Sequence, residues 1–297
     1  MADSPVDRVI RAQGWLEALG TLLQGAVGGV YGGLRGPGRL AKDLAHGSRL
    51  LGHPLHPALT DVPLGAWFVA VVADLVALLD HAFPTQAGDL ALAVGLVTGL
   101  GAVITGLTDH HETYGHELAV ATAHGVLMVL VMALMFASLL LRWFAGLGLH
   151  GLAVALAVLG LLLALGAAYL GGHLSFGLGT MVNRNAFTEG PEEYVTVGRA
   201  EDFVEGEPRA VLAGGVPVLV VRQGGRLFGI ADTCSHAGGP LHEGTLRGDV
   251  VTCPWHGSRF CVRDGSVRGG PATFAQPVFE VREHAGAVEV RRARALV

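Results

Sequence analysis

The chain has 297 residues, enough for one large or two ordinary domains. Hydrophobic residues make up 51% of it, charged residues only 15%, and the mean hydropathy is +0.49. This balance excludes a disordered chain, a fibrous repeat and a wholly soluble globular protein, so we expect part of the chain in lipid. The net charge of −5 leaves no basic footprint for nucleic acid. Three cysteines are too few for a disulfide framework. If they take part in chemistry, we expect metal binding or redox chemistry in a reducing compartment.

Residues 1–50 form a basic N-terminal segment with an apolar stretch at 15–34. Because this stretch contains Glu17 and many glycines, it predicts an amphipathic helix at the membrane interface rather than a membrane span. An acidic residue at position 3 and the lack of a small-residue cleavage site argue against an export signal. The basic residues are Arg8, Arg11, Arg35, Arg39, Lys42 and Arg49.

Residues 51–174 are expected to form a transmembrane domain of four helices. Long apolar stretches, with no charged residue at 90–108, 118–141 and 143–183, predict spans at about 62–82, 89–109, 118–142 and 148–171, each close to the ~20 apolar residues that a bilayer core requires. The connections are short, which favours an up-down bundle, and interior glycines suit close approach of helices in lipid. Asp74 lies near the middle of the first span and predicts either a proton path or a hydrogen bond between helices.

The distribution of basic residues predicts the orientation of this domain. An even number of spans puts both termini on one face, together with the basic N-terminal segment and Arg184, whereas the opposite turns offer only Arg142. By the positive-inside rule we expect a multi-pass protein of the bacterial inner membrane with both termini in the cytoplasm.

Histidines gather at the span ends on the face of the termini. The first and third spans of an up-down bundle are diagonal, so His56 and His124 could face each other across the axis as axial ligands of a b-type haem. A quinone or proton-relay pocket is one alternative. The other is a layer of histidines at wet helix ends, hydrogen-bonded to carboxylates such as Asp61, Asp109 and Glu112.

Residues 175–192 are interpreted as a linker and residues 193–297 as a small all-β domain. Short alternating runs, separated by turn signals such as Gly224-Gly225, predict a compact antiparallel sandwich or barrel. The expected strands are 217–222, 226–231, 250–253, 277–283 and 287–292. Two loops between them, at 234–241 and 253–260, concentrate Cys, His, Gly and Pro.

Each of these loops offers one thiolate and one imidazole, from Cys234 and His236 in the first and from Cys253 and His256 in the second. Two sulfur and two nitrogen ligands can hold a tetrahedral zinc or a [2Fe–2S] cluster. The near-identical loops favour the cluster, and glycines at 238, 239 and 257 let backbone N–H groups approach bridging sulfides. Cys261, on the next strand, is expected to be a small buried hydrophobic residue.

The loop sequences Cys-Ser-His-Ala-Gly-Gly-Pro-Leu at 234–241 and Cys-Pro-Trp-His-Gly-Ser-Arg-Phe at 253–260 resemble the Rieske iron–sulfur family. The resemblance implies that Cys234 and Cys253 ligate the buried iron of the cluster. It implies that His236 and His256 ligate the outer iron, which is the one reduced. It also implies that the hydroxyl of Ser258 donates to a bridging sulfide.

Two departures from the quinol-oxidising branch of that family bear on the reduction potential. Gly239 and Trp255 stand where that branch has a disulfide, and Phe260 stands where it has a tyrosine whose hydroxyl serves the cluster. Fewer hydrogen bonds to sulfur imply a lower potential, as in Rieske-type ferredoxins and the ferredoxin domains of ring-hydroxylating oxygenases. Forty-one residues follow His256, too few for the active site of an oxygenase.

Residues 51–174 resemble a bacterial family of four-helix membrane domains of unknown function, whose members sometimes carry a Rieske module. The motifs of this resemblance lie at 52–57, 123–125 and 170–174, and they imply the topology but no activity. We therefore expect a membrane-anchored Rieske-type ferredoxin, an electron-transfer protein or oxidoreductase subunit. It would carry single electrons between a membrane partner, quinol or haem, and a soluble partner. The alternatives are an iron–sulfur redox sensor coupled to the bundle and a zinc-stabilised interaction domain.

Overall fold

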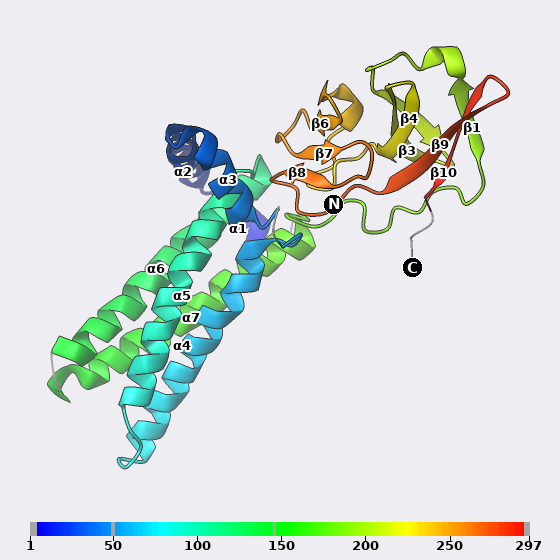
Figure 1. The fold of residues 1–297 in the computed structure, drawn as a ribbon. Helices are drawn as coiled ribbons and strands as arrows, with labels where there is room; N and C mark the ends of the chain where they lie inside the picture. The colour runs from blue at the N-terminus through cyan, green and yellow to red at the C-terminus, as the bar shows by residue number, and fades with distance from the viewer. Residues whose placement is uncertain (1–4, 49–50, 145–146, 294–297) are drawn as a thin grey trace. The chain divides into compact units, whose positions relative to one another are not determined.

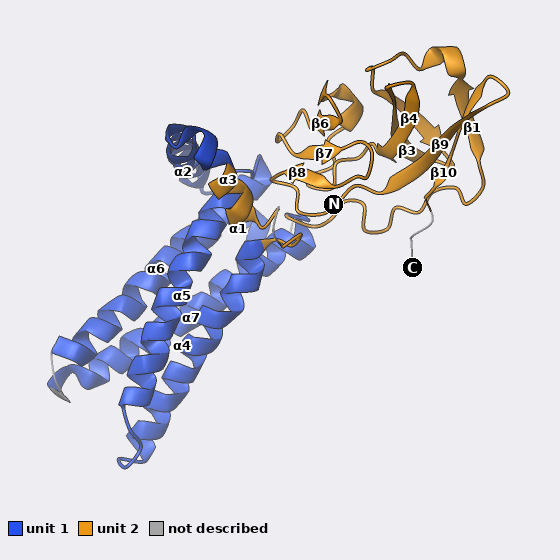
Figure 2. Cartoon of the chain, in the orientation of Figure 1, with its two compact units in different colours: residues 1–39, 55–180 blue, residues 40–54, 181–297 orange. Residues whose placement is uncertain are grey.

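A computed structural model of the chain describes residues 5–48, 51–144 and 147–293. The chain forms two compact units, residues 1–39 with 55–180 and residues 40–54 with 181–297 (Figures 1 and 2). Long helices dominate the first unit and β-strands the second. The predicted architecture, a helical domain followed by an all-β domain, is confirmed. Arg49, one of the basic residues counted above, lies outside the described residues.

Four long helices form a bundle in the first unit. They are α4 (Leu55–Leu79), α5 (Gln86–His110), α6 (His116–Phe144) and α7 (His150–Gly172), which continues as a π-helical turn (His173–Gly177). All four are long and apolar enough to cross a membrane. Helix α4 begins seven residues before the predicted start. Pro57 does not prevent this, because it falls in the first turn, where a missing N–H breaks no helical hydrogen bond. His56 therefore lies within α4 and not ahead of it.

The four helices are arranged as two helical hairpins. The helices of each hairpin, α4 with α5 and α6 with α7, pack more extensively with each other than with the other pair. Glycines serve as notches for large side chains: a Cβ at Gly160 would lie 2.9 Å from Cε of the fully buried Met135. Trp67, also fully buried, lies against Gly95 in the same way. These interior glycines thus admit a bulky neighbour, where close approach of two backbones was predicted.

A buried ion pair connects all four helices. Arg142 donates to both carboxylate oxygens of Asp74, at 2.7 and 2.5 Å, and the two side chains are 1% and 0% exposed. Arg142 also donates to Asp89 at 3.1 Å and to Ser138 at 3.2 Å, and Ser138 donates to the carbonyl of Ala153 at 2.6 Å. Of the two interpretations of Asp74, the structure shows the contact between helices. Arg142 is a buried partner in that contact and not a free charge at a turn.

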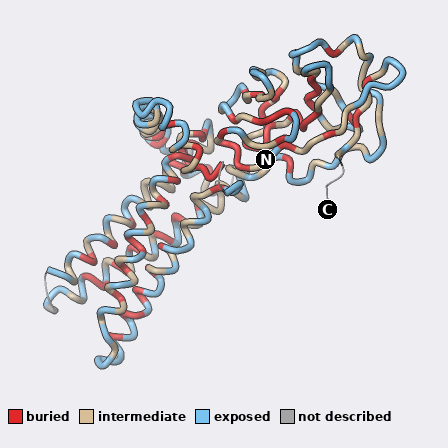
Figure 3. Tube along the Cα trace, in the orientation of Figure 1, coloured by how far each residue is buried: buried red, intermediate tan, exposed pale blue. Residues whose placement is uncertain are grey.

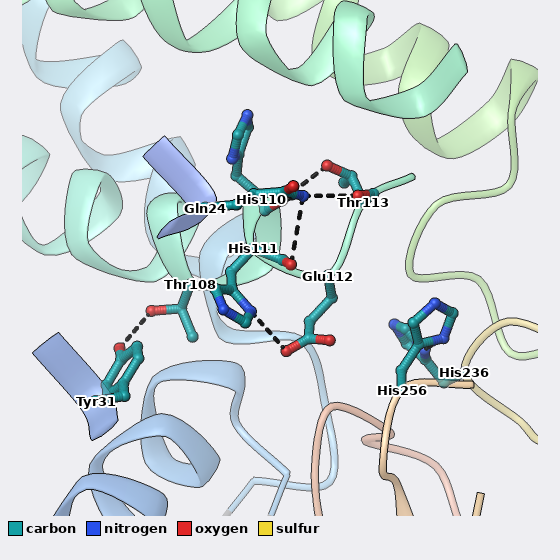
Figure 4. Close-up of polar contacts among 9 residues, drawn as sticks. All are labelled: Gln24, Tyr31, Thr108, His110, His111, Glu112, Thr113, His236 and His256. Carbon is teal, nitrogen blue, oxygen red and sulfur yellow. Dashed lines mark hydrogen bonds and ion pairs between the residues drawn. The ribbon is translucent and has the colours of Figure 1, made fainter. Parts of the chain in front are cut away.

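Three shorter helices precede the bundle: α1 (Pro5–Arg11), α2 (Gly14–Gly33) and α3 (Arg35–His46). The predicted helix at 15–34 corresponds to α2, which packs against the ends of α5 and α6. The Nε2 of Gln24 donates to the carbonyls of His110 and Thr113, at 3.1 and 2.7 Å, and so caps the end of α5 (Figure 4). Within the described residues, α2 is not among the helices apolar enough to cross a membrane.

The second unit contains two antiparallel sheets, in the orders β1-β10-β9-β4-β3-β2 and β5-β6-β7-β8. The first comprises β1 (Val195–Arg199), β2 (Arg209–Ala213), β3 (Val216–Gln223), β4 (Arg226–Ala231), β9 (Val278–His284) and β10 (Ala287–Arg292). The second comprises β5 (Thr245–Arg247), β6 (Val250–Thr252), β7 (Arg259–Cys261) and β8 (Val267–Gly269). All five predicted strands are present, and sequence reasoning missed β1, β2, β5, β7 and β8.

Strand β3 separates two hydrophobic cores, because its alternate side chains point to opposite faces. Val218 and Val220 pack in one core and Leu219 and Val221 in the other. The core that contains Leu219 and Val221 also contains residues of both Cys/His loops. Figure 3 shows buried residues in the β-strand unit and along the long helices. Cys261 is 5% exposed, as expected of a small buried residue.

Candidate metal centre

The two Cys/His loops share one backbone hydrogen-bond pattern. The N–H groups of Cys234 and Cys253 each donate to the carbonyl five residues further along the chain, at 2.8 Å in both loops. A glycine closes each loop: Gly238 donates to the carbonyl of Cys234 at 2.9 Å, and Gly257 donates to that of Cys253 at 3.1 Å. Both glycines have positive φ, 86° and 74°, a conformation that L side chains rarely adopt. The sequence thus builds the same loop twice.

The loops bring two thiols and two imidazoles together. The Nδ1 atoms of His236 and His256 lie 3.2 Å apart, with ring centroids at 4.9 Å, and Figure 4 shows the two rings side by side. The thiols of Cys234 and Cys253 are hydrogen-bonded to each other. The cysteines are 1% and 3% exposed, His236 is 9% exposed and His256 is half-buried. The sulfur donors therefore lie deeper than the nitrogen donors.

The surroundings of the two thiols favour the deprotonated, metal-binding form at Cys253. The hydrogen bond from Cys234 lowers the pKa of the Cys253 thiol to about 6, and the same bond raises the pKa of Cys234. Two backbone N–H groups also face each sulfur, those of residues 236 and 237 at Cys234 and those of residues 255 and 256 at Cys253. Such donors stabilise a thiolate, so the loops are prepared for an electron-rich ligand set.

Gly239 allows the two loops to approach each other. A Cβ at this position would lie 2.9 Å from Sγ of Cys253 and 3.0 Å from the ring of Trp255. The neighbouring sulfur and indole therefore leave no room for a side chain, although the φ of Gly239 is an ordinary one. Gly238 and Gly257 are thus required by the conformation of the loops, and Gly239 by the close contact between them.

Two serines of the Cys/His loops hold a third loop, residues 270–276. The hydroxyl of Ser235 donates to the carbonyl of Phe274 at 2.7 Å, and the hydroxyl of Ser258 accepts from the N–H of Ala272 at 3.0 Å. Ser258 is fully buried. Because its oxygen accepts this bond, its own proton remains to be donated in another direction.

Further residues that support the first loop were not identified from the sequence. Asp232 is 5% exposed and accepts from both the N–H and the Nδ1 of His242, each at 2.8 Å. The side-chain amide of Asn185 donates to the carbonyl of Thr233 at 2.7 Å. Asn185 falls in the segment interpreted as a linker, whose residues from 181 onward belong to the second unit. No local sequence signal could have revealed these contacts, because the partners lie on different loops.

Residues 40–54 also belong to the second unit, although the sequence places them ahead of the membrane domain. Asp43 is 5% exposed, and it accepts from the N–H of Gly270 at 2.8 Å and from Arg259 at 3.4 Å. Asp43 thus holds the start of the third loop, which Ser235 and Ser258 hold further along.

Several histidines of the first unit bind carboxylates. The Nε2 atoms of His116 and His173 both lie 2.8 Å from the same oxygen of Asp7, on α1. The Nδ1 of His111 lies 3.1 Å from Glu112 (Figure 4). For these three residues the structure agrees with the predicted layer of hydrogen-bonded histidines, but the shared carboxylate is Asp7, which sequence reasoning did not name.

His56 and His124 are brought together, as the diagonal arrangement of their helices predicted. His56 lies on α4 and His124 on α6, and their ring centroids are 6.3 Å apart. Both residues are half-buried.

Comparison with known proteins identifies both parts of the chain. Residues 193–280 match the Rieske [2Fe–2S] domain, and residues 52–184 match the predicted membrane protein family DUF2231. Over 98 residues, 33% of this chain, it is 40% identical to ferredoxin CarAc of Metapseudomonas resinovorans and covers 92% of that protein. The chain belongs to the Rieske [2Fe–2S] family. The Rieske domain is also 42% identical to the ferredoxin component of biphenyl 2,3-dioxygenase from Rhodococcus jostii, over 27% of this chain and 76% of that protein.

A solved complex of reduced oxygenase and oxidised ferredoxin in carbazole 1,9a-dioxygenase also matches the Rieske domain. Identity is 37% over 36% of this chain and 99% of that chain, with a TM-score of 0.34. The two family matches, the identity to ferredoxin CarAc and the four apolar helices make the protein a membrane protein with a ferredoxin-like electron-carrier domain. The paired thiols and imidazoles fit the [2Fe–2S] cluster of this family, because they supply two sulfur and two nitrogen donors from two equivalent loops.

Proposed function

We propose that the protein is a membrane-anchored Rieske ferredoxin that carries single electrons between a redox centre in the membrane and a soluble partner. Cys234 and Cys253 would hold one iron, and His236 and His256 the other. When bound, the cluster supplies one-electron transfer. The observation that carries the proposal is the convergence of these four side chains from two loops of equal backbone structure.

The residues around the cluster loops have separate roles in this proposal. Backbone N–H groups stabilise the two thiolates, and the buried core around them keeps water from the sulfur side. The half-buried His256 and the neighbouring Trp255, 56% exposed, form the accessible edge. We therefore place electron exchange with a partner at this edge, because His256 is the most exposed of the four residues that would hold the cluster.

The soluble partner is proposed to be an oxidoreductase component. Some relatives are named as ferredoxin components of dioxygenases, which supports this class of partner. The exposed Trp255 offers such a partner an aromatic contact. The proposed orientation places the Rieske domain in the cytoplasm. Arg142, the basic residue counted on the opposite side, is paired with two carboxylates inside the bundle, so it adds no net positive charge there.

The test is metal analysis and EPR spectroscopy of the full chain purified in detergent. We expect about two irons per chain and, after reduction, a rhombic signal with the low average g value of a cluster with imidazole ligands. His256→Ala should abolish the signal, whereas His284→Ala, at an exposed hairpin position, should leave it unchanged. Stoichiometric zinc without iron would contradict the proposal and support the zinc-stabilised interaction domain.

A further inference from the structure

The membrane domain contains a second pair of imidazoles that the Rieske domain does not use. His56 and His124 come from the diagonal helices α4 and α6, and their rings are nearly perpendicular, at 84°. An ionisable pair inside a transmembrane bundle is costly to maintain, so it calls for a functional or structural explanation.

Each ring is held by a backbone carbonyl of the neighbouring helix. The Nδ1 of His56 lies 2.9 Å from the carbonyl of Ala102 on α5, and the Nδ1 of His124 lies 2.8 Å from that of Ala167 on α7. A carbonyl only accepts, so Nδ1 carries the proton in both neutral rings. This leaves the lone pair on Nε2, which is the arrangement found in metal-ligating histidines.

The two hairpins repeat this arrangement. In each, a histidine on the first helix is bonded to an alanine carbonyl on the second, and a glycine follows that alanine four residues later. Both glycines lie beside the ring of their own histidine: a Cβ at Gly106 would lie 2.7 Å from Cε1 of His56, and one at Gly171 would lie 3.4 Å from Cε1 of His124. The two hairpins thus hold their histidines in equivalent ways, with the two ring centroids 6.3 Å apart.

The separation of the rings corresponds to ligands on opposite sides of one metal ion. A nitrogen ligand lies about 2.0 Å from its metal and roughly 1.1 Å from its ring centroid, so two opposed imidazoles have centroids about 6 Å apart. The observed separation is 6.3 Å. We propose that His56 and His124 are the axial ligands of a haem iron held between the two hairpins.

The class of cofactor follows from what surrounds the rings. The rings pack against Ala102, Gly106, Ala167 and Gly171, which carry no side-chain ligand atom. The hydroxyl of Thr105 also lies 3.4 Å from Nδ1 of His56, but it donates to backbone carbonyls of its own helix. A metal ion held by two opposed imidazoles needs its other ligands from the cofactor, and a porphyrin supplies four nitrogens in the plane between them. A flat group between the two rings would insert between the hairpins, which pack less extensively with each other than the helices within each hairpin do.

A haem at this point would be the membrane redox centre of the proposed function, and this part of the inference rests on that function. Haem iron and a [2Fe–2S] cluster each gain or lose one electron, so exchange between them balances without a further oxidant or reductant. The haem ligation itself stands on the geometry of the membrane domain alone.

The experiment is optical and EPR spectroscopy of the full chain purified in detergent, before and after titration with hemin. We expect one b-type haem per chain with the sharp bands of a low-spin, bis-imidazole iron. The perpendicular rings predict a highly anisotropic low-spin ferric EPR signal instead of the rhombic signal of parallel rings. His56→Ala and His124→Ala should each lose the low-spin spectrum.

Matched variants separate ligation from general damage to the bundle. Gly106→Ala should lose haem, because its Cβ would displace the ring of His56, whereas Gly125→Ala, next to His124 but with open space around it, should keep it. His150→Ala, at the other end of α7, should also keep it. Helical circular dichroism shows whether each variant is folded.

Four outcomes would overturn the haem proposal. They are no haem after titration with no other cofactor bound, no haem after titration with a tightly bound quinone in its place, haem retained in His56→Ala/His124→Ala, and a low-spin spectrum that survives in either single variant. The cluster signal is measured separately, so loss of haem with an intact cluster, or the reverse, shows which of the two proposals fails.

Discussion

Removal of Arg142 is expected to destabilise the membrane domain strongly. Arg142→Met would leave the carboxylate of Asp74, which is 0% exposed, without the two hydrogen bonds that it accepts at 2.7 and 2.5 Å. Removing one partner of a buried ion pair typically costs about 3–5 kcal/mol, because the other charge remains buried and uncompensated. Asp89, 23% exposed, loses one bond and adds less to this cost.

A double variant tests whether the loss of stability comes from the unpaired charge of Asp74. Asp74→Leu/Arg142→Met removes both buried charges, and its free energy of unfolding should return to within about 1–2 kcal/mol of the wild type, as for buried pairs replaced by apolar residues. The free energy can be measured by unfolding the protein in mixed micelles with increasing denaturing detergent, followed by circular dichroism. Arg199→Met, which breaks an exposed ion pair with Glu201, is the control and should change stability little. An Arg142→Met variant as stable as the control would refute the reasoning.

Three other predictions concern the Rieske domain. Ser258→Ala should lower the reduction potential by roughly 40 mV, equivalent to about 1 kcal/mol of hydrogen bonding in a one-electron couple, in a redox titration followed by EPR. It should also lower the melting temperature, because the buried N–H of Ala272 loses its acceptor. Asp43→Ala should destabilise the domain by about 1–3 kcal/mol, as the N–H of Gly270 is left unpaired, and an unchanged melting temperature would contradict this. A reporter cysteine at the exposed Glu207 should react with an impermeant maleimide in inverted vesicles but not in intact cells; the reverse would place the domain outside the cytoplasm.

The features that the sequence predicted correctly are those carried by short-range patterns. Long apolar stretches identified the four long helices, because the length of an apolar helix follows directly from the thickness of a bilayer. Alternating runs identified the four strands of six to eight residues and the short β6, but missed β5, β7 and β8, whose three residues are too few to show a period, and the five-residue β1 and β2. The Cys/His loops were evident because a ligand set needs particular residue types at fixed spacing.

Only the tertiary structure showed which distant residues become partners. Asp43 and the N–H of Gly270 are 227 positions apart, and Arg142 and Asp74 are 68 apart. Neither pair follows any local period, since the free energy that selects it comes from burying polar groups together after the helices and sheets have packed. The same holds for the facing imidazoles of the membrane domain: spacing placed them on diagonal helices, but the ring orientation and the carbonyls that fix it depend on how the two hairpins pack.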